Sequence, residues 1–271
     1  MRRVICASAA AVLSMLFAEP AASQNTADTN TDMARKLANP LGAMIVVPVD
    51  MYYDTGYGPA DGDRFVAKFK PIIPFELNDN WNLITRTIVP VVFQNDVFGP
   101  SGKQFGLGDT TTSLFLSPVD TGVDGLIWGA GPIFLLPTAT DDYLGGEKWG
   151  AGPTAIIIKQ TGPTTVGFLG SHVWSFAGND NRDDVNATFL QPFITYRFSR
   201  VWSVGLTTET TYDWENDAWS VPVDLTLSRL VKFGDQPVNL TAGVRYWAET
   251  PDGGPDRWGA RLGLSFIFPN G

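Results

Sequence analysis

Apolar and polar residues alternate along most of this chain, and the C-terminal stretch shows the pattern most clearly. Between residues 238 and 249, apolar side chains from Val238 and Leu240 onward alternate with polar ones such as Asn239 and Arg245. A Pro-Asp-Gly-Gly-Pro run follows, which favours a turn, and the alternation resumes over residues 258–268. Because successive side chains of a β-strand point to opposite faces, this period of two predicts two strands, each with one apolar face.

Residues 42–271 repeat this pattern in runs of about ten residues, separated by turn-forming segments. We predict about twelve strands, at residues 43–53, 64–75, 81–93, 105–117, 126–138, 149–160, 164–176, 185–198, 202–214, 219–232, 238–249 and 258–268. Their connections are short at one end and longer and more acidic at the other. This asymmetry is typical of an all-β fold, an antiparallel up-and-down transmembrane β-barrel with short periplasmic turns and longer external loops.

Composition bears on the choice between a membrane barrel and a soluble β-sandwich, which also alternates. After residue 23 no apolar run approaches the ~18 residues that a membrane helix needs. Yet the mean hydropathy is −0.00 and 12% of the residues are aromatic. A chain of this kind either folds as a soluble β domain or crosses a membrane as a closed barrel, because lipid tolerates no unpaired strand edge.

Tryptophan placement favours the barrel. Indole is apolar with one N–H to satisfy, so it prefers the headgroup layer, and a barrel is expected to carry two aromatic belts. Three tryptophans fall near strand ends at the short turns, namely Trp81, Trp128 and Trp202. The other six fall near the longer loops: Trp149, Trp174, Trp214, Trp219, Trp247 and Trp258.

Prolines inside the predicted strands are evidence against a fully regular barrel, because each removes a donor from the hydrogen-bonded ladder. They are Pro71, Pro90, Pro132, Pro153, Pro192 and Pro222. A closed barrel has no edge strand to hold them, so we expect bulges or irregular hydrogen bonding at these positions.

The N-terminus predicts export. Residues 1–23 have a basic head, an apolar middle and small residues at the end, which is the pattern of a cleaved secretory signal peptide. Residues 24–41 are polar and predict a periplasmic leader, with a possible short helix, ahead of the barrel at 42–271.

Cys6 is the only cysteine, so the mature chain has no disulfide or thiolate metal site. Cleavage removes two arginines and one glutamate, changes the formal net charge from −9 to −10, and leaves an acidic chain unsuited to nucleic acid.

Charged residues on the face opposite the apolar one predict a polar lumen, because a charge on the lipid side costs a few kcal/mol near the midplane. The candidate lumen and solute-binding residues are Lys68, Lys70, Arg86, Asp109, Glu209, Asp224, Arg245 and Arg261. Closure of the barrel brings the basic residues together as one wall, with Glu209 and Asp224 nearby. Two interpretations remain open: a pore constriction whose transverse field orients a small polar or anionic solute, or a narrow lumen closed by ion pairs.

Other candidate chemistry is weaker. A rim lipase needs a serine, a histidine and a polar orienting residue, and Ser171, His172 and Asn179 lie close in sequence. Adjacent residues of a strand point to opposite faces, however, so His172 is expected to have no catalytic role. Glycines at 106–108 and 150–152 suit a curved wall better than a phosphate loop. The acidic loops are expected to be solvated, so we predict no metal site, no cofactor and no enzyme activity.

The last strand carries a recognisable spacing. Arg261, Gly263, Phe266 and Phe268 follow the polar-x-Gly-x-x-aromatic-x-aromatic order of the final strand of bacterial outer-membrane barrels. This motif resembles the signal read by the barrel assembly machinery. The expected partners are therefore that machinery, outer-membrane lipid with lipopolysaccharide, and a small-molecule solute.

Several segments resemble a family of uncharacterised bacterial outer-membrane proteins labelled as transporters or as neuromedin U, similar to the barrel family associated with phenol-degradation gene clusters. The matching segments are residues 37–41, 81–84, 86–88, 104–110, 134–142, 149–154, 184–193, 210–214 and 243–251. The resemblance implies an outer-membrane barrel, implies transport more loosely, and brings no catalytic residue. We predict an outer-membrane channel for passive uptake or efflux of small polar, anionic or aromatic solutes. A rim lipid hydrolase and a closed structural barrel are the alternatives.

Overall fold

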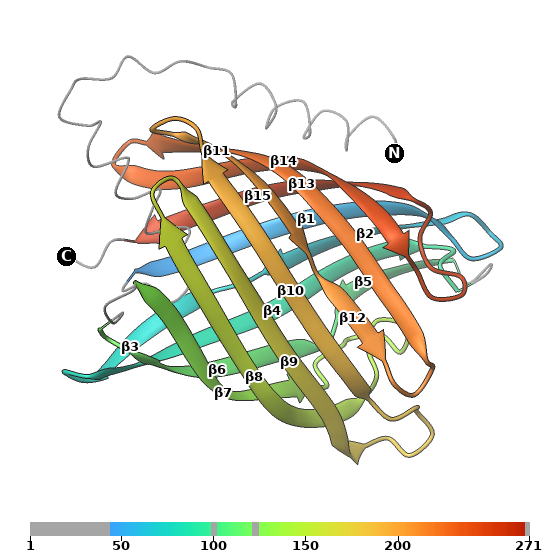
Figure 1. Cartoon of the computed structure of the whole chain (residues 1–271). Coiled ribbons are helices and arrows are strands. Elements are labelled where there is room, and N and C mark those ends of the chain that lie inside the picture. The colour runs from blue at the N-terminus through green and yellow to red at the C-terminus, as the bar shows by residue number, and fades with distance from the viewer. Residues whose placement is uncertain (1–43, 99–101, 121–124, 269–271) are drawn as a thin grey trace.

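The computed structural model describes residues 44–98, 102–120 and 125–268, which form one antiparallel β-barrel (Figure 1). The strand segments are β1 (Ile45–Tyr57), β2 (Gly62–Phe69), β3 (Ile72–Asn78), β4 (Trp81–Asn95), β5 (Lys103–Leu107), β6 (Thr110–Pro118), β7 (Leu126–Leu136), β8 (Lys148–Thr161), β9 (Thr164–Gly178), β10 (Asn186–Arg197), β11 (Trp202–Thr208), β12 (Thr210–Asp213), β13 (Ala218–Phe233), β14 (Gln236–Glu249) and β15 (Trp258–Phe268). The predicted signal peptide and leader lie outside the described residues. Within the described ranges, no helix is long and apolar enough to cross a membrane.

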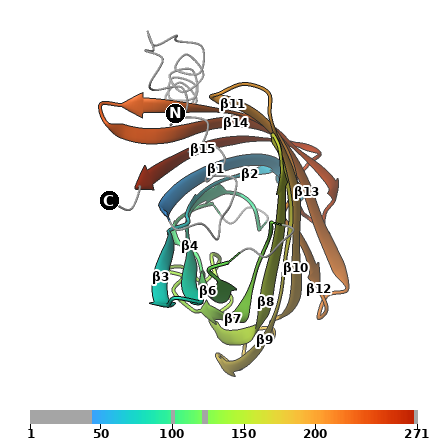
Figure 2. The ribbon, with the colours of Figure 1, turned by 60° about the vertical axis from the view of Figure 1, so that its left-hand side comes forward.

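The barrel is closed by its first and last strands. β15 pairs with β1 from Ile45–Phe268 to Asp54–Gly259, and the other strands pair with their neighbours in sequence. Because β2–β3, β5–β6 and β11–β12 each form one interrupted strand, the wall has twelve strands, as predicted. Figure 2 shows these strands curving round an interior.

The two rims differ in their connections. At the short-turn rim, β8 meets β9 through residues 162–163 and β13 meets β14 through Gly234 and Asp235. Gly234 has φ of +61°, a conformation that favours glycine and lets the chain reverse in two residues. At the loop rim, the connections include residues 137–147, 179–185 and 250–257. This is the predicted arrangement of short turns and longer loops.

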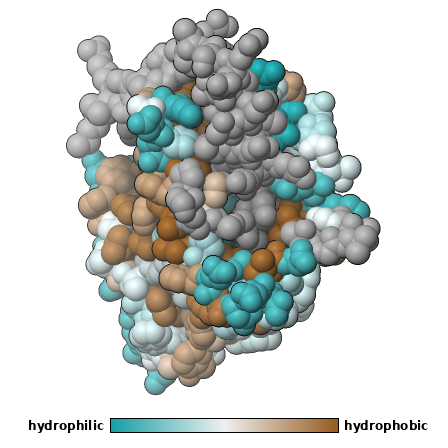
Figure 3. All heavy atoms as spheres, turned by 90° about the vertical axis from the view of Figure 1, so that its left-hand side faces the viewer, coloured by the Kyte–Doolittle hydropathy of each residue, from teal (hydrophilic) through white to brown (hydrophobic). Residues whose placement is uncertain are grey.

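The outside of the wall is apolar. Large hydrophobic side chains point outward at alternate positions of the strands, for example Phe168, Leu206, Leu225 and Val244. The face shown in Figure 3 carries hydrophobic patches beside hydrophilic ones. A surface of this kind is stable against lipid, because the backbone polar groups are paired within the closed wall.

Depth in the membrane can be tested on β13, where Leu225 and Phe233 lie on the same face and are both 51% exposed. Leu225 is near the middle of the strand and Phe233 is its last residue. We expect Leu225→Arg to destabilise the barrel by about 2–4 kcal/mol and Phe233→Arg by about 0–1 kcal/mol, because an arginine near the interface reaches water. Urea unfolding in lipid vesicles measures both; equal costs would contradict a lipid-facing wall.

Most tryptophans lie where the aromatic belts were predicted. Six are exposed near strand ends: Trp128, Trp149, Trp174, Trp214, Trp219 and Trp258. At the short-turn rim, the rings of Trp81 and Trp128 pack edge to face with centroids 6.1 Å apart. For Trp247 the predicted place in the aromatic belt was wrong. Its indole N–H donates to Asp54 Oδ1 at 2.9 Å, so this ring belongs to the barrel interior and not to the lipid-facing belt.

The wall is irregular near the strand prolines, as predicted. Pro71 falls in the gap between β2 and β3. Pro192 faces the gap between β11 and β12, and the pairing of β13 with β14 shifts register at Val221 and Pro222. Proline lacks the N–H that a continuous ladder needs, so the breaks fall where a donor is missing.

Glycines fit the wall where strands approach closely. A Cβ added at Gly152 would lie 1.8 Å from the carbonyl oxygen of His172 on β9. The pairing of β8 with β9 is interrupted there, between Ala151–Trp174 and Thr154–Ser171. The glycines of residues 150–152 therefore serve the packing of the wall, as the sequence predicted.

Candidate functional site: a charged cluster and a cavity inside the barrel

Charged side chains from six parts of the wall meet inside the barrel around one tyrosine. We call this group the lumen cluster; its members are Asp50, Tyr52, Asp54, Lys68, Lys70, Glu209, Asp224, Arg245 and Arg261. The period of two explains much of the grouping, because members such as Lys68, Asp224 and Arg245 alternate with outward apolar neighbours on their strands.

Glu209 connects opposite parts of the wall. It lies in the gap between β11 and β12, and four strands, β13, β14, β15 and β1, separate it from β2 along the sheet. Its Oε2 is 2.8 Å from Lys68 Nζ and its Oε1 is 3.1 Å from Lys70 Nζ. These two ion pairs therefore cross the lumen.

A second set of ion pairs joins the strands on either side of the closure. Asp224 accepts two hydrogen bonds from the guanidinium of Arg245, at 3.0 and 3.1 Å, and its side chain is 0% exposed. Asp50 lies between Lys70 Nζ at 2.9 Å and Arg261 Nη2 at 3.2 Å. Each carboxylate thus has a direct cationic partner, which offsets the cost of removing it from water.

Tyr52 occupies the centre of the cluster and is 1% exposed. Its ring centroid is 4.9 Å from Lys68 Nζ, 4.0 Å from Arg245 Cζ and 5.4 Å from Arg261 Cζ. Cations above an aromatic face are attracted by the negative charge of the ring face. The hydroxyl donates to Glu209 Oε1 at 3.4 Å and accepts from Lys70 Nζ at 3.3 Å, so this residue holds both sets of ion pairs together.

The structure brings together six of the eight predicted lumen residues in the cluster: Lys68, Lys70, Glu209, Asp224, Arg245 and Arg261. Arg86 lies beside them in a cavity. Asp109 lies apart, in the gap between β5 and β6, where it accepts hydrogen bonds from the backbone N–H groups of Ala139 and Gly146. Its role in the structure is to hold the loop between β7 and β8.

Sequence reasoning missed Asp50, Tyr52 and Asp54, although all three lie on one face of β1. The signal was present, because these residues alternate with Val49, Met51 and Tyr53. The apolar and polar faces of this strand are less distinct than elsewhere, since tyrosines occupy both. The acidic members of the cluster were therefore undercounted.

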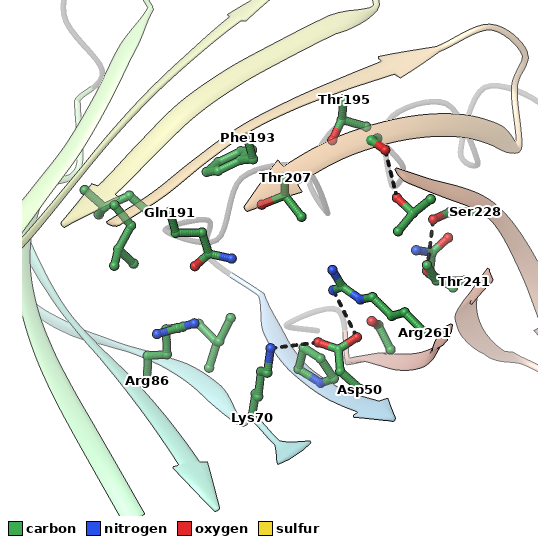
Figure 4. Close-up of a pocket in the computed structure, with 18 of the residues that line it drawn as sticks. Asp50, Lys70, Arg86, Gln191, Phe193, Thr195, Thr207, Ser228, Thr241 and Arg261 are labelled. Carbon is green, nitrogen blue, oxygen red and sulfur yellow. Dashed lines mark hydrogen bonds and ion pairs between the residues drawn. The ribbon is translucent and has the colours of Figure 1, made fainter. Parts of the chain in front are cut away.

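A cavity of about 290 Å³ adjoins the cluster within the barrel. Figure 4 shows Lys70, Asp50, Arg261 and Arg86 on one side of it, with Gln191 and Phe193 across from them. Hydroxyl groups complete the lining, and Ser228 and Thr241 are joined by a 2.9 Å hydrogen bond. The cavity therefore carries charge on one side and hydroxyl, amide and aromatic groups on the other.

Part of the interior is apolar, which the sequence analysis did not predict. A cluster of buried side chains lines the inner face of β4 and of β6 to β9; it comprises Ile84, Phe115, Ile127, Ile156, Ile158 and Leu169. Four of these, Ile84, Phe115, Ile156 and Leu169, also line the cavity. Residues 155–158 are apolar on both faces of the strand, so alternation alone could not identify an apolar inner side.

Ser171 and His172 do not form the serine–histidine pair that a rim lipase needs. Ser171 is buried, whereas His172 has its ring 4.0 Å from that of exposed Trp174 and faces the other side of β9. His172 Nδ1 is 2.7 Å from Thr188 Oγ1, and Nε2 is 3.1 Å from Asn186 Oδ1. These contacts hold the imidazole ring between polar side chains of β10.

The acidic loop between β9 and β10 uses one of its carboxylates within the protein. Asp184 accepts from Lys148 Nζ at 2.8 Å and from the hydroxyl of Ser175 at 3.1 Å. The hydrogen bond from Lys148 is the main reason that the pKa of Asp184 lies below its ordinary value. Within the described ranges, no group of three or more histidine, cysteine, aspartate or glutamate residues is placed to hold a metal ion.

Comparison with known proteins establishes the class of fold. No protein-family model and no curated protein sequence matches the chain. The crystal structure of an outer-membrane channel from Pseudomonas putida F1 matches with a TM-score of 0.65 and 16% identity, over 83% of this chain and 96% of that one. Outer membrane phospholipase A from Escherichia coli matches with a TM-score of 0.50 and 13% identity, over 83% and 90% of the two chains. This chain therefore has the fold of outer-membrane β-barrels.

Proposed function

We propose that this protein is a channel of the bacterial outer membrane that lets small solutes pass through its lumen, with the lumen cluster as the constriction. The fold alone does not decide this, because both a channel and a phospholipase share it. The observation that carries the proposal is the cavity of about 290 Å³ beside the cluster, which leaves space for a small solute inside the barrel.

Charge at the constriction supports passage of polar solutes. Lys68 keeps 30% of its side chain exposed, so this side of the Glu209 ion pair remains in contact with open space. Rings of paired charge in a narrow pore select solutes by size and by sign. Transport here needs no cofactor or energy source, because diffusion along a concentration gradient suffices.

The proposal is tested with the purified barrel in planar lipid bilayers and in liposomes. We expect small discrete conductance steps, and swelling rates that fall steeply as the test solute grows from an amino acid to a disaccharide. Absence of steps for both the native chain and Glu209→Ala, with folding verified by resistance to urea, would favour a closed structural barrel.

Lipid hydrolysis is the competing function from another class. It requires a nucleophile activated by a base, and the geometry of Ser171 and His172 does not supply that pair. Release of fatty acid from phospholipid vesicles by the native chain, lost in His172→Ala, would overturn the channel proposal in favour of an enzyme.

A further inference from the structure

The charged groups of the lumen cluster and Arg86 do not balance. The lumen cluster and Arg86 together contain five cations and four carboxylates. The cations are Lys68, Lys70, Arg86, Arg245 and Arg261, and the carboxylates are Asp50, Asp54, Glu209 and Asp224. Among the described residues, Arg86 is the member of this group that has no carboxylate within ion-pair distance. The formal excess of one positive charge is therefore located at Arg86.

Arg86 is placed to meet a ligand. It is partly exposed on the inner face of β4, where it pairs with Ser113 of β6 and Ile72 of β3, and it lines the cavity (Figure 4). The nearby carboxylates are already engaged, Asp50 by Lys70 and Arg261, and Glu209 by the two lysines. A planar guanidinium that faces open space is suited to bind a carboxylate through two parallel hydrogen bonds.

The surface next to Arg86 is apolar. Ile84 is two residues before it on the same face of β4, and Phe115 lies directly across from Ile84 on β6. Ile156 and Leu169 extend this surface along β8 and β9, and the four side chains are buried in one cluster. A ligand bound at Arg86 would thus have a cation at one end and hydrocarbon along its body.

We propose that the cavity is a binding site for a monocarboxylate with a compact apolar body, such as an aromatic acid, with Arg86 holding the carboxylate and the wall around Ile156 holding the body. This deepens the proposed channel function by naming its solute class, and it rests on that function. The volume is near the lower end of the ~300–1,000 Å³ typical of ligand sites, which fits a small acid.

The same lining disfavours other solutes. An ammonium group meets the uncompensated positive charge of Arg86. A second carboxylate at the end of the ligand that packs against Ile156 and Leu169 would be placed on an apolar surface, which is costly. Acetate satisfies Arg86 but buries little apolar surface, so it is expected to bind more weakly than benzoate.

Calorimetric titration of the barrel in a nonionic detergent tests the site with benzoate, acetate and benzylamine as probes. For the native chain we expect benzoate to bind more tightly than acetate, and benzylamine not to bind. Arg86→Gln is expected to weaken benzoate binding about 10- to 100-fold, the usual worth of a hydrogen-bonded charge. Ile156→Thr keeps the branched shape and is expected to weaken benzoate several-fold while leaving acetate unchanged.

Arg64→Gln is the matched control. Arg64 also faces the interior, but it bonds to Gln94 at 2.8 Å and does not line the cavity. Its substitution removes the same charge and should leave benzoate binding unchanged. Equal benzoate affinity in the native chain and Arg86→Gln would overturn the proposal, as would an equal loss in Arg64→Gln, which would indicate a general charge effect.

The same preparations are then placed in planar bilayers, which separates the two proposals. Conductance steps that benzoate reduces in the native chain, but not in Arg86→Gln, support both the channel and the site. Steps that benzoate does not affect, together with no calorimetric binding, overturn the site and leave the channel. Binding without any conductance would instead overturn the channel.

Discussion

Glu209→Ala is expected to raise single-channel conductance several-fold and to lower the free energy of unfolding by about 3 kcal/mol. Removal of one partner from a buried ion pair leaves the other charge uncompensated, which typically costs about 3–5 kcal/mol; the lower end applies here because Lys68 is 30% exposed. Conductance rises because the side chain that bridges the lumen is gone.

Selectivity should change with conductance. Loss of the Glu209 carboxylate leaves Lys68 and Lys70 facing the pore without their shared partner, so the open channel is expected to favour anions more strongly. Reversal potentials in a salt gradient measure this change, and urea unfolding in lipid vesicles measures stability.

Glu215→Ala controls for the loss of a carboxylate. Glu215 is exposed in the connection between β12 and β13, so its removal changes net charge equally without touching the lumen. An unchanged conductance in Glu209→Ala, with Glu215→Ala also unchanged, would mean that the Glu209 bridge does not limit the pore.

Asp224→Ala is expected to have the second large effect, a destabilisation of about 3–5 kcal/mol. Asp224 is fully buried and lies directly opposite Arg245 in the pairing of β13 with β14. Its loss removes the two hydrogen bonds, at 3.0 and 3.1 Å, that the guanidinium of Arg245 donates to it. A midpoint shift in urea titration, measured with the barrel in vesicles, reports the cost.

A double-mutant cycle identifies the pair as the cause. Combining Asp224→Ala with Arg245→Ala removes both charges, so the double variant is expected to be less destabilised than the sum of the single variants. Asp235→Ala, in the exposed turn between β13 and β14, should cost less than about 0.5 kcal/mol. Strict additivity of the two single variants would show that the ion pair contributes nothing.

Strand positions were predictable because the barrel imposes the same two-residue alternation on every strand. The predicted 81–93 became β4 (Trp81–Asn95), and the predicted 258–268 became β15 without change. The gaps between β2 and β3 and between β11 and β12 were not located, although irregularity near prolines was expected. A gap depends on which donors the neighbouring strands lack, as at Pro192, and this requires the register.

The site was predictable only in part, for the same reason. Inward charges could be assigned from their strands, so Lys70, Glu209 and Arg261 were identified. Which charges meet across the lumen depends on the curvature of the wall and on side-chain length. The apolar inner surface formed by Ile156 and its neighbours was missed because both faces of that strand carry hydrocarbon.

The seam between β1 and β15 has a consequence for assembly. Arg261 and Asp50 are 211 residues apart in sequence and form their ion pair across the seam. Neither can find this partner until the first and last strands have met, so the loop entropy of nearly the whole chain must be lost beforehand. The charged centre of the pore is thus completed by the final step of barrel closure. An intermediate in which β1 and β15 have not yet paired has Asp50 without its partner Arg261.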